Sequence, residues 1–556
     1  MPGIGVYREE QKLYFLVLLL DQDLQVSTSS LVASTHAQYL ALGLVSALTI
    51  LRNGLKVRII EKEPSIRKPG QRGAGIQIEE QSGGRAPPFQ LHTSPEGEKP
   101  IGMFEMHQKM EPTSDRPIVN PTVLGQQPHE AILRSVIESD YGVTVEVGTA
   151  LVSLEQHPDS VTVVLDHHDG EQETAKFDWV IGADGARGVV RKQLGLTFLG
   201  ETRQKDRATV IGDIFVKSGL EGRFCRSWGT NADRQINLLT FEKHEDRYTF
   251  ICGGVNLDCQ KMSSSREAWL ETFYDVTGRR DVVFGDVIWM GTWGANIRMA
   301  NKFGEGRVFI VGDAGHVHSP TGAQGLNSCV QDAINIAWKL ALVHKKLSPP
   351  TLLDSYTAER LPVIASMLGW TTELLNSTYK AETANSGLGR PAEMHQLGVN
   401  YRGSPIVVDR LGKPSSVDPY RSGLDEGPLR AGDRAPDAPE LVEASRADVK
   451  RLFDIFKPTY HTVLVFGWEG LDDVRSLVGK YSSDVVKTAV ICPADSNTTE
   501  TKTHQGVDFA FVDKGYAHKH YGIEKSGVVV VRPDGYVGAV VNDLEGLRQY
   551  FSKIFV

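Results

Sequence analysis

The chain has 556 residues, which is long enough for two to four domains and a deep internal pocket. Its 40% hydrophobic and 23% charged residues are ordinary for a soluble globular protein, and its net charge of −9 argues against a nucleic-acid surface, which needs clustered cations. The five cysteines include no C-x-x-C pair, so we expect free thiols in a reducing compartment and a cytoplasmic protein.

Residues 13–20 form the first apolar run of the chain. Eight residues cannot cross a bilayer as a helix. Acidic residues flank the run on both sides and no small-x-small cleavage site follows closely, which argues against a signal peptide. We therefore predict a buried strand, and neither a membrane segment nor secretion.

Residues 43–62 predict a helix followed by a short strand. Gly54 is a suitable C-cap, and residues 57–60 are an apolar run of strand length. The apolar face of the helix consists of Leu44, Ala47, Leu48 and Leu51. Glu61 lies at the end of the strand, where an acidic residue of a βαβ unit binds the ribose hydroxyls of a dinucleotide.

The phosphate-binding turn of such a unit is missing from its usual place. A G-x-G-x-x-G sequence should lie directly between the first strand and the helix, but only Gly43 is available there. About twenty residues separate the run 13–20 from the helix, which is too long for a tight turn. Two interpretations remain open: a gene-model or splicing error has replaced the Gly-rich turn, or the chain has diverged and binds pyrophosphate more weakly.

Three stretches before residue 300 carry further patterns. Gln126 opens a predicted helix. Residues 177–191 predict a buried strand, a tight Asp-Gly turn at Asp184 and a basic helix start. Residues 205–300 contain short alternating strands, which indicate a mostly antiparallel sheet separate from the nucleotide-binding layers.

The most informative stretch begins at residue 307. Residues 308–311 are a continuous apolar run, which predicts a strand buried on both faces, and Gly312-Asp313 ends it abruptly. An acidic residue at the carboxyl end of such a strand can accept a hydrogen bond from a ribityl or ribose hydroxyl. We therefore expect Asp313 to be a ligand-binding residue.

A loop and a helix start complete this pattern. Pro320 and Gly325 shape the loop, and apolar residues at helical spacing follow. The first N–H groups of a helix have no partner within it and carry partial positive charge, so those of Leu326 and Asn327 would face an electron-rich atom. Together with the preceding strand and its acid, this helix start predicts a site for a polar, phosphate-bearing ligand.

His316 and His318 could form a pair of metal ligands. No third ligand lies at a suitable spacing in the sequence, so roles in loop packing are favoured and no metal is expected.

The full pattern is Gly-Asp-Ala-x-His-x-x-x-Pro-x-x-x-Gln-Gly-x-Asn, followed by Asp-Ala-x-Asn-x-x-Trp-Lys-Leu. It closely resembles the second flavin-binding signature of the single-component FAD-dependent aromatic hydroxylases, the phenol and para-hydroxybenzoate hydroxylase class. Residues 177–191 resemble the Asp-Gly motif of the same family, and Ser355-Tyr-x-x-Glu-Arg-x-Pro362 resembles a helix that braces its flavin domain. The resemblance implies FAD as cofactor, and NAD(P)H and O₂ as co-substrates.

The resemblance also implies roles for individual residues. Asp313 would bind the ribityl chain, Asp184 would serve both FAD and NAD(P)H, and the loop from Pro320 to Asn327 would pass beneath the isoalloxazine. Phenol hydroxylases proper carry an aspartate near the substrate where this chain has Ala74, so no catalytic acid is assigned. The complete set of expected cofactor-binding residues is Glu61, Arg72, Ala74, Gln126, Asp184, Gly312, Asp313, Pro320, Gly325, Leu326 and Asn327.

In this family an antiparallel sheet roofs the substrate pocket. Tyr248, Phe250, Trp289 and Trp293 are therefore candidate pocket walls, although ordinary core packing is favoured for any one of them. Arg187 and Arg191 could face the phosphates of a nucleotide. The phenol hydroxylase subfamily also has a thioredoxin-like C-terminal domain, and five strand-like runs after residue 460 fit it. Without a C-x-x-C it is expected to serve structural support or the dimer contact of a homodimer.

The expected fold is α/β: a Rossmann-like FAD-binding domain with an inserted, mostly antiparallel substrate sheet and a C-terminal thioredoxin-like domain. The predicted boundaries are 1–200 and 301–380 for the two parts of the FAD domain, 201–300 for the sheet, 381–440 for a linker and 441–556 for the last domain. The predicted activity is hydroxylation of a phenolic or other aromatic small molecule. The alternative is a non-catalytic or FAD-impaired member of the family, because the G-x-G-x-x-G turn is missing.

Overall fold

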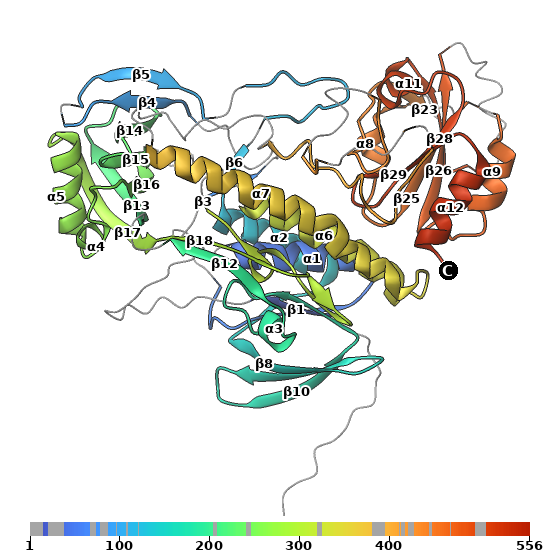
Figure 1. The fold of residues 1–556 in the computed structure, drawn as a ribbon, viewed down its shortest axis with the longest axis horizontal. Coiled ribbons are helices and arrows are strands. Elements are labelled where there is room, and N and C mark those ends of the chain that lie inside the picture. Colours follow the sequence, from blue (N-terminus) through green and yellow to red (C-terminus); the bar gives the residue numbers. More distant parts are fainter. Residues whose placement is uncertain are drawn as a thin grey trace, which may run out of the picture.

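Figure 1 shows three parts in the computed structural model: a central layered part, a second sheet on one side and a C-terminal domain on the other. Helix α7 (Asp354–Lys380) extends from beside the C-terminal domain to the second sheet. The structure describes residues 15–19, 38–66, 74–77, 87–95, 97–106, 109–120, 122–203, 208–240, 246–319, 325–380, 395–410, 412, 418–420, 428–443, 448–467, 469–494 and 507–556.

The central part contains a six-stranded sheet in which all neighbours are parallel except the edge strand β19. Its strands are apolar throughout the middle, as expected where helices cover both faces of a parallel sheet. In spatial order they are β19 (Gly304–Glu305), β20 (Val308–Ile310), β11 (Trp179–Ala183), β1 (Phe15–Leu19), β2 (Val57–Glu61) and β7 (Val145–Val147).

The apolar run near the N-terminus is a strand, as predicted. Phe15–Leu19 lies in the centre of the sheet and pairs with β11 on one side and β2 on the other. The connection from β1 to the first helix lies outside the described residues. The position of β1 therefore matches the first strand of a dinucleotide-binding unit, even though the usual turn sequence is missing.

Helices pack on this sheet and on one another. Helix α1 packs against α6, α2 and strands β1, β2 and β11. The interior is formed by the apolar faces of α1 and α6 together with the middle strands. The helices of this part are α1 (Gln38–Arg52), α2 (Gln126–Tyr141), α3 (Val189–Gln193), α6 (Gly325–His344) and α7, with 3-10 turns η1 (Gly312–Ala314) and η2 (Pro350–Leu353).

Three small antiparallel sheets accompany the central one. The first is β8 (Thr149–Gln156), β9 (Val161–His167) and β10 (Gln172–Phe177); the second is β12 (Phe198–Arg203), β18 (Ala295–Ala300) and β21 (His316–Val317); the third is β3 (Ala74–Gln77) and β6 (Thr122–Gly125).

The second sheet has seven strands and is antiparallel except for the β14–β4 pair. Helices α4 (Cys259–Met262) and α5 (Arg266–Thr277) pack on one face of it. In order the strands are β17 (Val283–Trp293), β13 (Thr209–Ser218), β16 (Arg247–Gly253), β15 (Gln235–Leu239), β14 (Cys225–Gly229), β4 (Phe89–His92) and β5 (Pro100–Phe104). The sheet predicted for residues 205–300 thus also recruits β4 and β5, which the predicted boundaries placed in the FAD domain.

The C-terminal domain has an eight-stranded mixed sheet with helices α8 (Leu452–Ile455), α9 (Leu471–Val478), α11 (Tyr516–Tyr521) and α12 (Leu544–Ile554). The strand–helix–strand unit β25–α9–β26 is followed by the antiparallel hairpin β28–β29 and α12, which is the arrangement expected for a thioredoxin-like domain. The strands in order are β22 (Val408–Asp409), β29 (Val537–Val541), β28 (Gly527–Val531), β25 (His461–Phe466), β26 (Val486–Pro493), β27 (Phe509–Asp513), β23 (Leu441–Glu443) and β24 (Val449–Lys450).

The stretch predicted as a linker is well packed where the structure describes it. Val399, Tyr401 and Ile406 are buried in the same apolar core as α6 and α7, and β22 joins the C-terminal sheet. The composition of this stretch, which predicted a linker with little regular structure, gave no sign of this burial. Among the described helices, none combines the length and the apolar character needed to span a membrane.

Candidate active site

The parallel strands of the central sheet end together at one edge. The strand register places Leu19 of β1 beside both Glu61 of β2 and Ala183 of β11. Asp184 directly follows Ala183, and Asp313 follows β20, the neighbour of β11. Three acidic residues predicted from the sequence therefore lie along the edge where open α/β sheets bind their ligands.

Asp184 is fully buried and uses only one of its carboxylate oxygens within the protein. Its Oδ2 accepts a hydrogen bond of 2.8 Å from the N–H of Val190, at the start of α3. Its Oδ1 is buried and has no hydrogen-bond partner in the described structure. Burial raises the pKa of Asp184 to about 6, although the N–H of Val190 and the charge of Arg191 act in the opposite direction. Asp184 thus has a free acceptor for a bound group.

Asp313 lies in the turn η1 and is almost completely buried. The preceding Gly312 has φ +60°, a backbone conformation that favours glycine. A Cβ at Gly312 would collide with the side chain of Leu42 on α1 and would lie 3.0 Å from Cys329 Sγ on α6. The glycine therefore allows α1, α6 and the turn that carries Asp313 to approach one another closely.

Helix α6 begins at Gly325, as the sequence predicted. Gly325 and Leu326 are buried and Asn327 is half-buried. These three residues form the first turn, whose N–H groups have no partners within the helix and so can face a negatively charged atom. Pro320 lies outside the described residues.

Two other expected cofactor-binding residues come together from distant parts of the chain. Ala74 begins β3, and Gln126 begins α2 directly after β6. The β3–β6 register pairs Ala74 with Gly125, the residue before Gln126, and β3 lies beside α6. The backbone thus brings the two positions close together beside β3, which contacts α6, whereas Arg72 lies outside the described residues.

A buried hydrogen-bond network lies behind the turn of Asp313. Asp332 on α6 accepts hydrogen bonds from the backbone N–H of Gly312 at 3.2 Å and from Arg360 Nε at 2.7 Å. Its Oδ2 also lies 2.7 Å from His316 Nε2. Burial disfavours the carboxylate, but the charge of Arg360 keeps the pKa of Asp332 below its ordinary value. The network fixes the position of the turn relative to α6.

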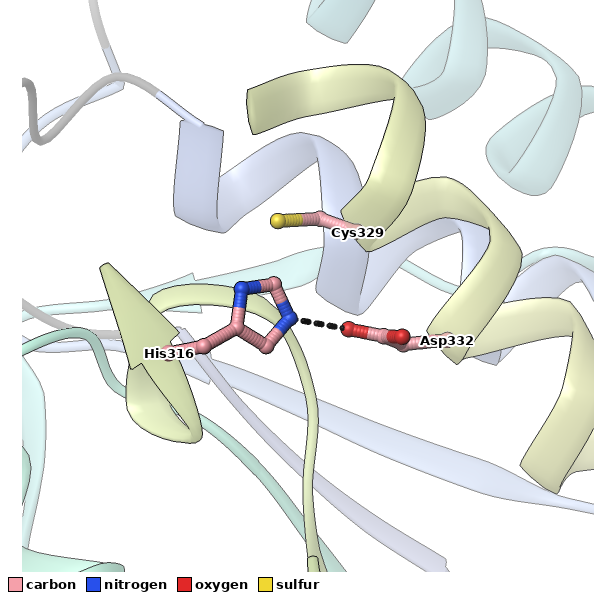
Figure 2. A group of neighbouring side chains, drawn as sticks. All are labelled: His316, Cys329 and Asp332. Atoms are coloured by element: carbon pink, nitrogen blue, oxygen red, sulfur yellow. Dashed lines mark hydrogen bonds and ion pairs between the residues drawn. The ribbon is translucent and has the colours of Figure 1, made fainter. Parts of the chain in front are cut away.

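Figure 2 shows His316 pointing at Asp332, with Cys329 one turn away on the same helix. The possible ligand atoms of the three residues lie within 4.8 Å of one another, a group that includes His316 but not His318 of the pair considered from the sequence. A divalent cation there would lie close to the buried guanidinium of Arg360, only 2.7 Å from Asp332. We therefore interpret the group as a hydrogen-bond network and not as a metal centre.

Comparison with known proteins identifies the family. A family model described as FAD binding domain matches residues 41–371, and one described as phenol hydroxylase, C-terminal dimerisation domain, matches residues 491–556. A flavin-dependent monooxygenase of Mycobacteroides abscessus is 31% identical over 529 residues, which cover 92% of this chain and 98% of the relative. The chain belongs to the FAD-dependent monooxygenases.

Other proteins similar to this monooxygenase support the same family assignment and fold. Pentachlorophenol 4-monooxygenase of Sphingobium chlorophenolicum is 29% identical, with 75% of this chain and 76% of that protein covered. The structure of the flavin-dependent monooxygenase PieE has a TM-score of 0.77 at 20% identity, covering 97% of this chain and 99% of that one. Aklavinone-11 hydroxylase has a TM-score of 0.74 at 20% identity, covering 99% and 100%. The two structures confirm the fold.

The described edge of the sheet fits FAD. The free Oδ1 of Asp184 and the carboxylates of Glu61 and Asp313 provide acceptors for hydroxyl groups, and the start of α6 provides donors for an electron-rich atom. Bound FAD supplies the redox chemistry of the monooxygenase, taking reducing equivalents from NAD(P)H and passing them to O₂.

Arg191 does not present its guanidinium to a phosphate in this structure. Its Nη1 donates to Ala314 O at 2.7 Å, its Nη2 donates to Ala186 O at 2.5 Å, and the guanidinium lies 3.8 Å from the centroid of the Phe198 ring. Arg191 therefore joins α3 to the turn that carries Asp313. Arg187 is exposed at the surface.

The four aromatic candidates for pocket walls divide between the two faces of the second sheet. Tyr248 and Phe250 belong to the core beneath α5, and Phe250 lies 4.7 Å from Trp269, so these two are core residues. Trp293 packs on the opposite face with Leu375 of α7. Because side chains alternate along a strand, Trp289 shares the face of Trp293.

Trp289 is held in place by a buried acid. Asp213 accepts hydrogen bonds from Trp289 Nε1 at 2.7 Å, Thr249 Oγ1 at 2.6 Å and Arg247 Nη2 at 2.8 Å. Between the two tryptophans of β17 lies Gly291, where an added Cβ would meet no described heavy atom within 4 Å beyond its chain neighbours. This face therefore offers a fixed indole beside an open position.

Proposed function

We propose that this monooxygenase uses NAD(P)H and O₂ to hydroxylate a phenolic or related aromatic small molecule. The observation that carries the proposal is made on the face of β17 that holds Trp289 and Trp293. There the open position at Gly291 lies between the two tryptophans, and Asp213 fixes Trp289. Planar aromatic molecules stack well against rigid indole rings. The names of two relatives, which refer to pentachlorophenol and aklavinone, support the same substrate class.

We further propose roles for the residues at the sheet edge. Glu61 would accept hydrogen bonds from the adenosine ribose, Asp313 from the ribityl chain, and Asp184 from FAD or NAD(P)H. The positions support this order, because the three acids lie at the carboxyl ends of β20, β11 and β2 in one sheet, with β1 between the last two. The other proposed cofactor-binding residues are Arg72, Ala74, Gln126, Gly312, Pro320 and Gly325.

The start of α6 would favour the reduced state of the flavin. Negative charge develops on the flavin ring upon reduction, and the N–H groups of Leu326 and Asn327 carry the positive end of the helix dipole. The second sheet would exclude water from the reacting oxygen, which prevents wasteful side reactions. No described residue is assigned as the base that would deprotonate a phenol.

The C-terminal domain would make the contact between two copies of the chain. Its last part matches the phenol hydroxylase dimerisation model, and the described residues contain no C-x-x-C that would give it redox work. A homodimer is therefore the expected assembly, which light scattering of the purified protein would test.

The first experiment is the visible spectrum of the purified and dialysed protein. Flavin bands near one FAD per chain would support the proposed site. A colourless protein would instead favour the FAD-impaired alternative, and a Gly-rich turn introduced before Leu44 would then restore binding if the altered N-terminal segment is responsible.

Substrate class is tested separately with a panel of phenols and polycyclic aromatic compounds. Product formation is followed by the mass increase of one oxygen atom, because NAD(P)H oxidation alone can also produce hydrogen peroxide. If the flavin-loaded protein hydroxylated none of these aromatic compounds, the proposed substrate class would be contradicted. The assignment of FAD would not be affected.

A further inference from the structure

Two adjacent charged residues of α7, Glu359 and Arg360, are both buried and belong to different polar clusters. They lie in the Ser-Tyr-x-x-Glu-Arg-x-Pro motif, whose neighbouring Tyr356 donates a hydrogen bond of 2.9 Å to the carbonyl of Ile310, the last residue of β20. This motif therefore contacts the strand that leads into the turn of Asp313.

The first cluster joins α7 to the C-terminal domain. Arg532, which follows β28, donates from Nη1 to Glu359 Oε1 at 2.6 Å and from Nη2 to Glu359 Oε2 at 2.9 Å. Glu359 also accepts hydrogen bonds from Lys339 Nζ at 2.7 Å and Ser404 Oγ at 2.6 Å. Burial opposes its charge, yet Arg532 and Lys339 hold the pKa of Glu359 below its ordinary value.

The turn that contains Arg532 also reaches α6 directly. Asp534 pairs with Arg532 and accepts a hydrogen bond of 3.0 Å from Trp338 Nε1 on α6. The guanidinium of Arg532 lies 5.3 Å from the centroid of the Trp338 ring. Lys339, the next residue of α6, contacts Glu359, the residue that Arg532 also holds.

The second cluster joins α7 to the start of α6. Arg360 donates to the carbonyl of Ser328 at 3.0 Å, to Asp332 at 2.7 Å and to Tyr401 Oη at 3.1 Å. Ser328 directly follows Asn327, and Asp332 holds the N–H of Gly312. The placement of α7 is thus linked to the placement of the first turn of α6.

Buried ion pairs are a poor means of gaining stability, since well-packed apolar residues would often stabilise as well or better. Their directional hydrogen bonds do fix one alignment of the elements that carry them. The four buried charges at Lys339, Glu359, Arg532 and Asp534 sum to zero, so the cluster is complete only when the C-terminal domain is docked.

We propose that Arg532 of the C-terminal domain is a positioning residue for the flavin site. It holds Glu359 and so fixes α7, and α7 in turn fixes the start of α6 through Arg360. This inference rests on the proposed placement of FAD at the start of α6. It assigns the C-terminal domain a role within its own chain, in addition to any contact between two chains.

The test compares Arg532→Met with Val531→Ala, a matched control at the preceding residue, the last of β28. Val531 is buried in the core of the C-terminal domain, so its truncation weakens that domain without removing the charge contact to α7. Arg532→Lys retains a charge but not the two-point contact. The double variant Glu359→Gln with Arg532→Met leaves Lys339 and Asp534 balanced and covers the case in which the single variant does not fold.

For each variant, the dissociation constant of FAD is measured by titration of the deflavinated protein, together with the visible spectrum and the flavin midpoint potential. We expect Arg532→Met and the double variant to weaken FAD binding at least tenfold and to shift the spectrum and potential. We expect the dissociation constant of Arg532→Lys to be intermediate. We expect that of Val531→Ala to stay within twofold of the wild-type value, even where its melting temperature falls as much as that of Arg532→Met.

The inference would be overturned if folded Arg532→Met had the FAD affinity, the spectrum and the midpoint potential of the wild type. It would also be overturned if Val531→Ala weakened FAD binding as much as Arg532→Met does. Failure of the wild-type protein itself to bind FAD would overturn the proposed site and this inference together. Failure to hydroxylate aromatic compounds affects only the proposed substrate class, because these measurements do not depend on turnover.

Discussion

Replacement of Asp332 by alanine tests the buried network behind the flavin site most directly. The change removes the 2.7 Å contact to Arg360, the 2.7 Å contact to His316 and the 3.2 Å bond from Gly312 N–H. It leaves the guanidinium of Arg360 buried without its carboxylate, and breaking a buried pair in this way costs about 3–5 kcal/mol.

This loss of stability predicts a measurable shift of the urea concentration at which half of the protein is unfolded. With a denaturant slope of about 3 kcal/mol per molar urea, the unfolding midpoint should fall by about 1–2 M. Unfolding is followed by tryptophan fluorescence and by the fluorescence of released flavin, which also reports whether the site opens before the rest of the protein. Asp332→Asn retains an acceptor for the N–H of Gly312 and should lose less stability than Asp332→Ala.

A double-mutant cycle gives the decisive control. Asp332→Ala combined with Arg360→Met removes both charges, so the double variant should lose clearly less stability than the sum of the single variants. Strict additivity, or a midpoint shift below about 0.3 M for Asp332→Ala, would show that this network does not hold the site as described.

Three further outcomes are expected. Asp313→Ala should raise the dissociation constant of FAD by about 10–100-fold, because a hydrogen bond to a charged group contributes about 1.5–3 kcal/mol; unchanged binding in a titration would remove Asp313 from the site. Gly291→Leu should raise the KM for an aromatic substrate and increase peroxide release while the flavin spectrum stays constant, and an unchanged KM would place the substrate elsewhere. Burial, aided by the charge of Arg532, lowers the pKa of His461 to about 3, so its contribution to stability is complete above pH 6.5 and is lost as the pH falls toward 3. At pH 4.5 the loss of stability amounts to about 3 kcal/mol, and urea unfolding of His461→Phe should be less sensitive to acid than that of the wild type.

Patterns confined to a few neighbouring residues predicted much of the fold. The apolar run that became β1 was identified without its usual turn, because a strand buried on both faces is recognisable from composition alone. Asp313 was proposed from its place after such a strand and from the family resemblance, and Asp184 from the resemblance of its Asp-Gly motif. Parallel strands then necessarily bring their carboxyl ends to one edge.

Contacts between distant segments were not predictable in the same way. His316, Asp332 and Arg360 meet only because of how α6 and α7 pack, and the sequence contains no spacing rule for that. A charged residue within an otherwise apolar helix face, such as Asp332 beside Ala333, was the available signal. Alternation along β16 indicated two faces, but it could not show that Tyr248 faces α5.

The pairing of Glu359 with Arg532 joins positions 173 residues apart and has a consequence for biosynthesis. While the chain emerges from the ribosome, Lys339 and Glu359 are made long before the arginine that completes their charge balance. On the proposed role of Arg532, helix α6 would reach its final alignment only after the last β-hairpin has formed. Chains that stop early would hold the cofactor poorly and expose themselves to proteases, so flavin loading would report on whether synthesis was completed.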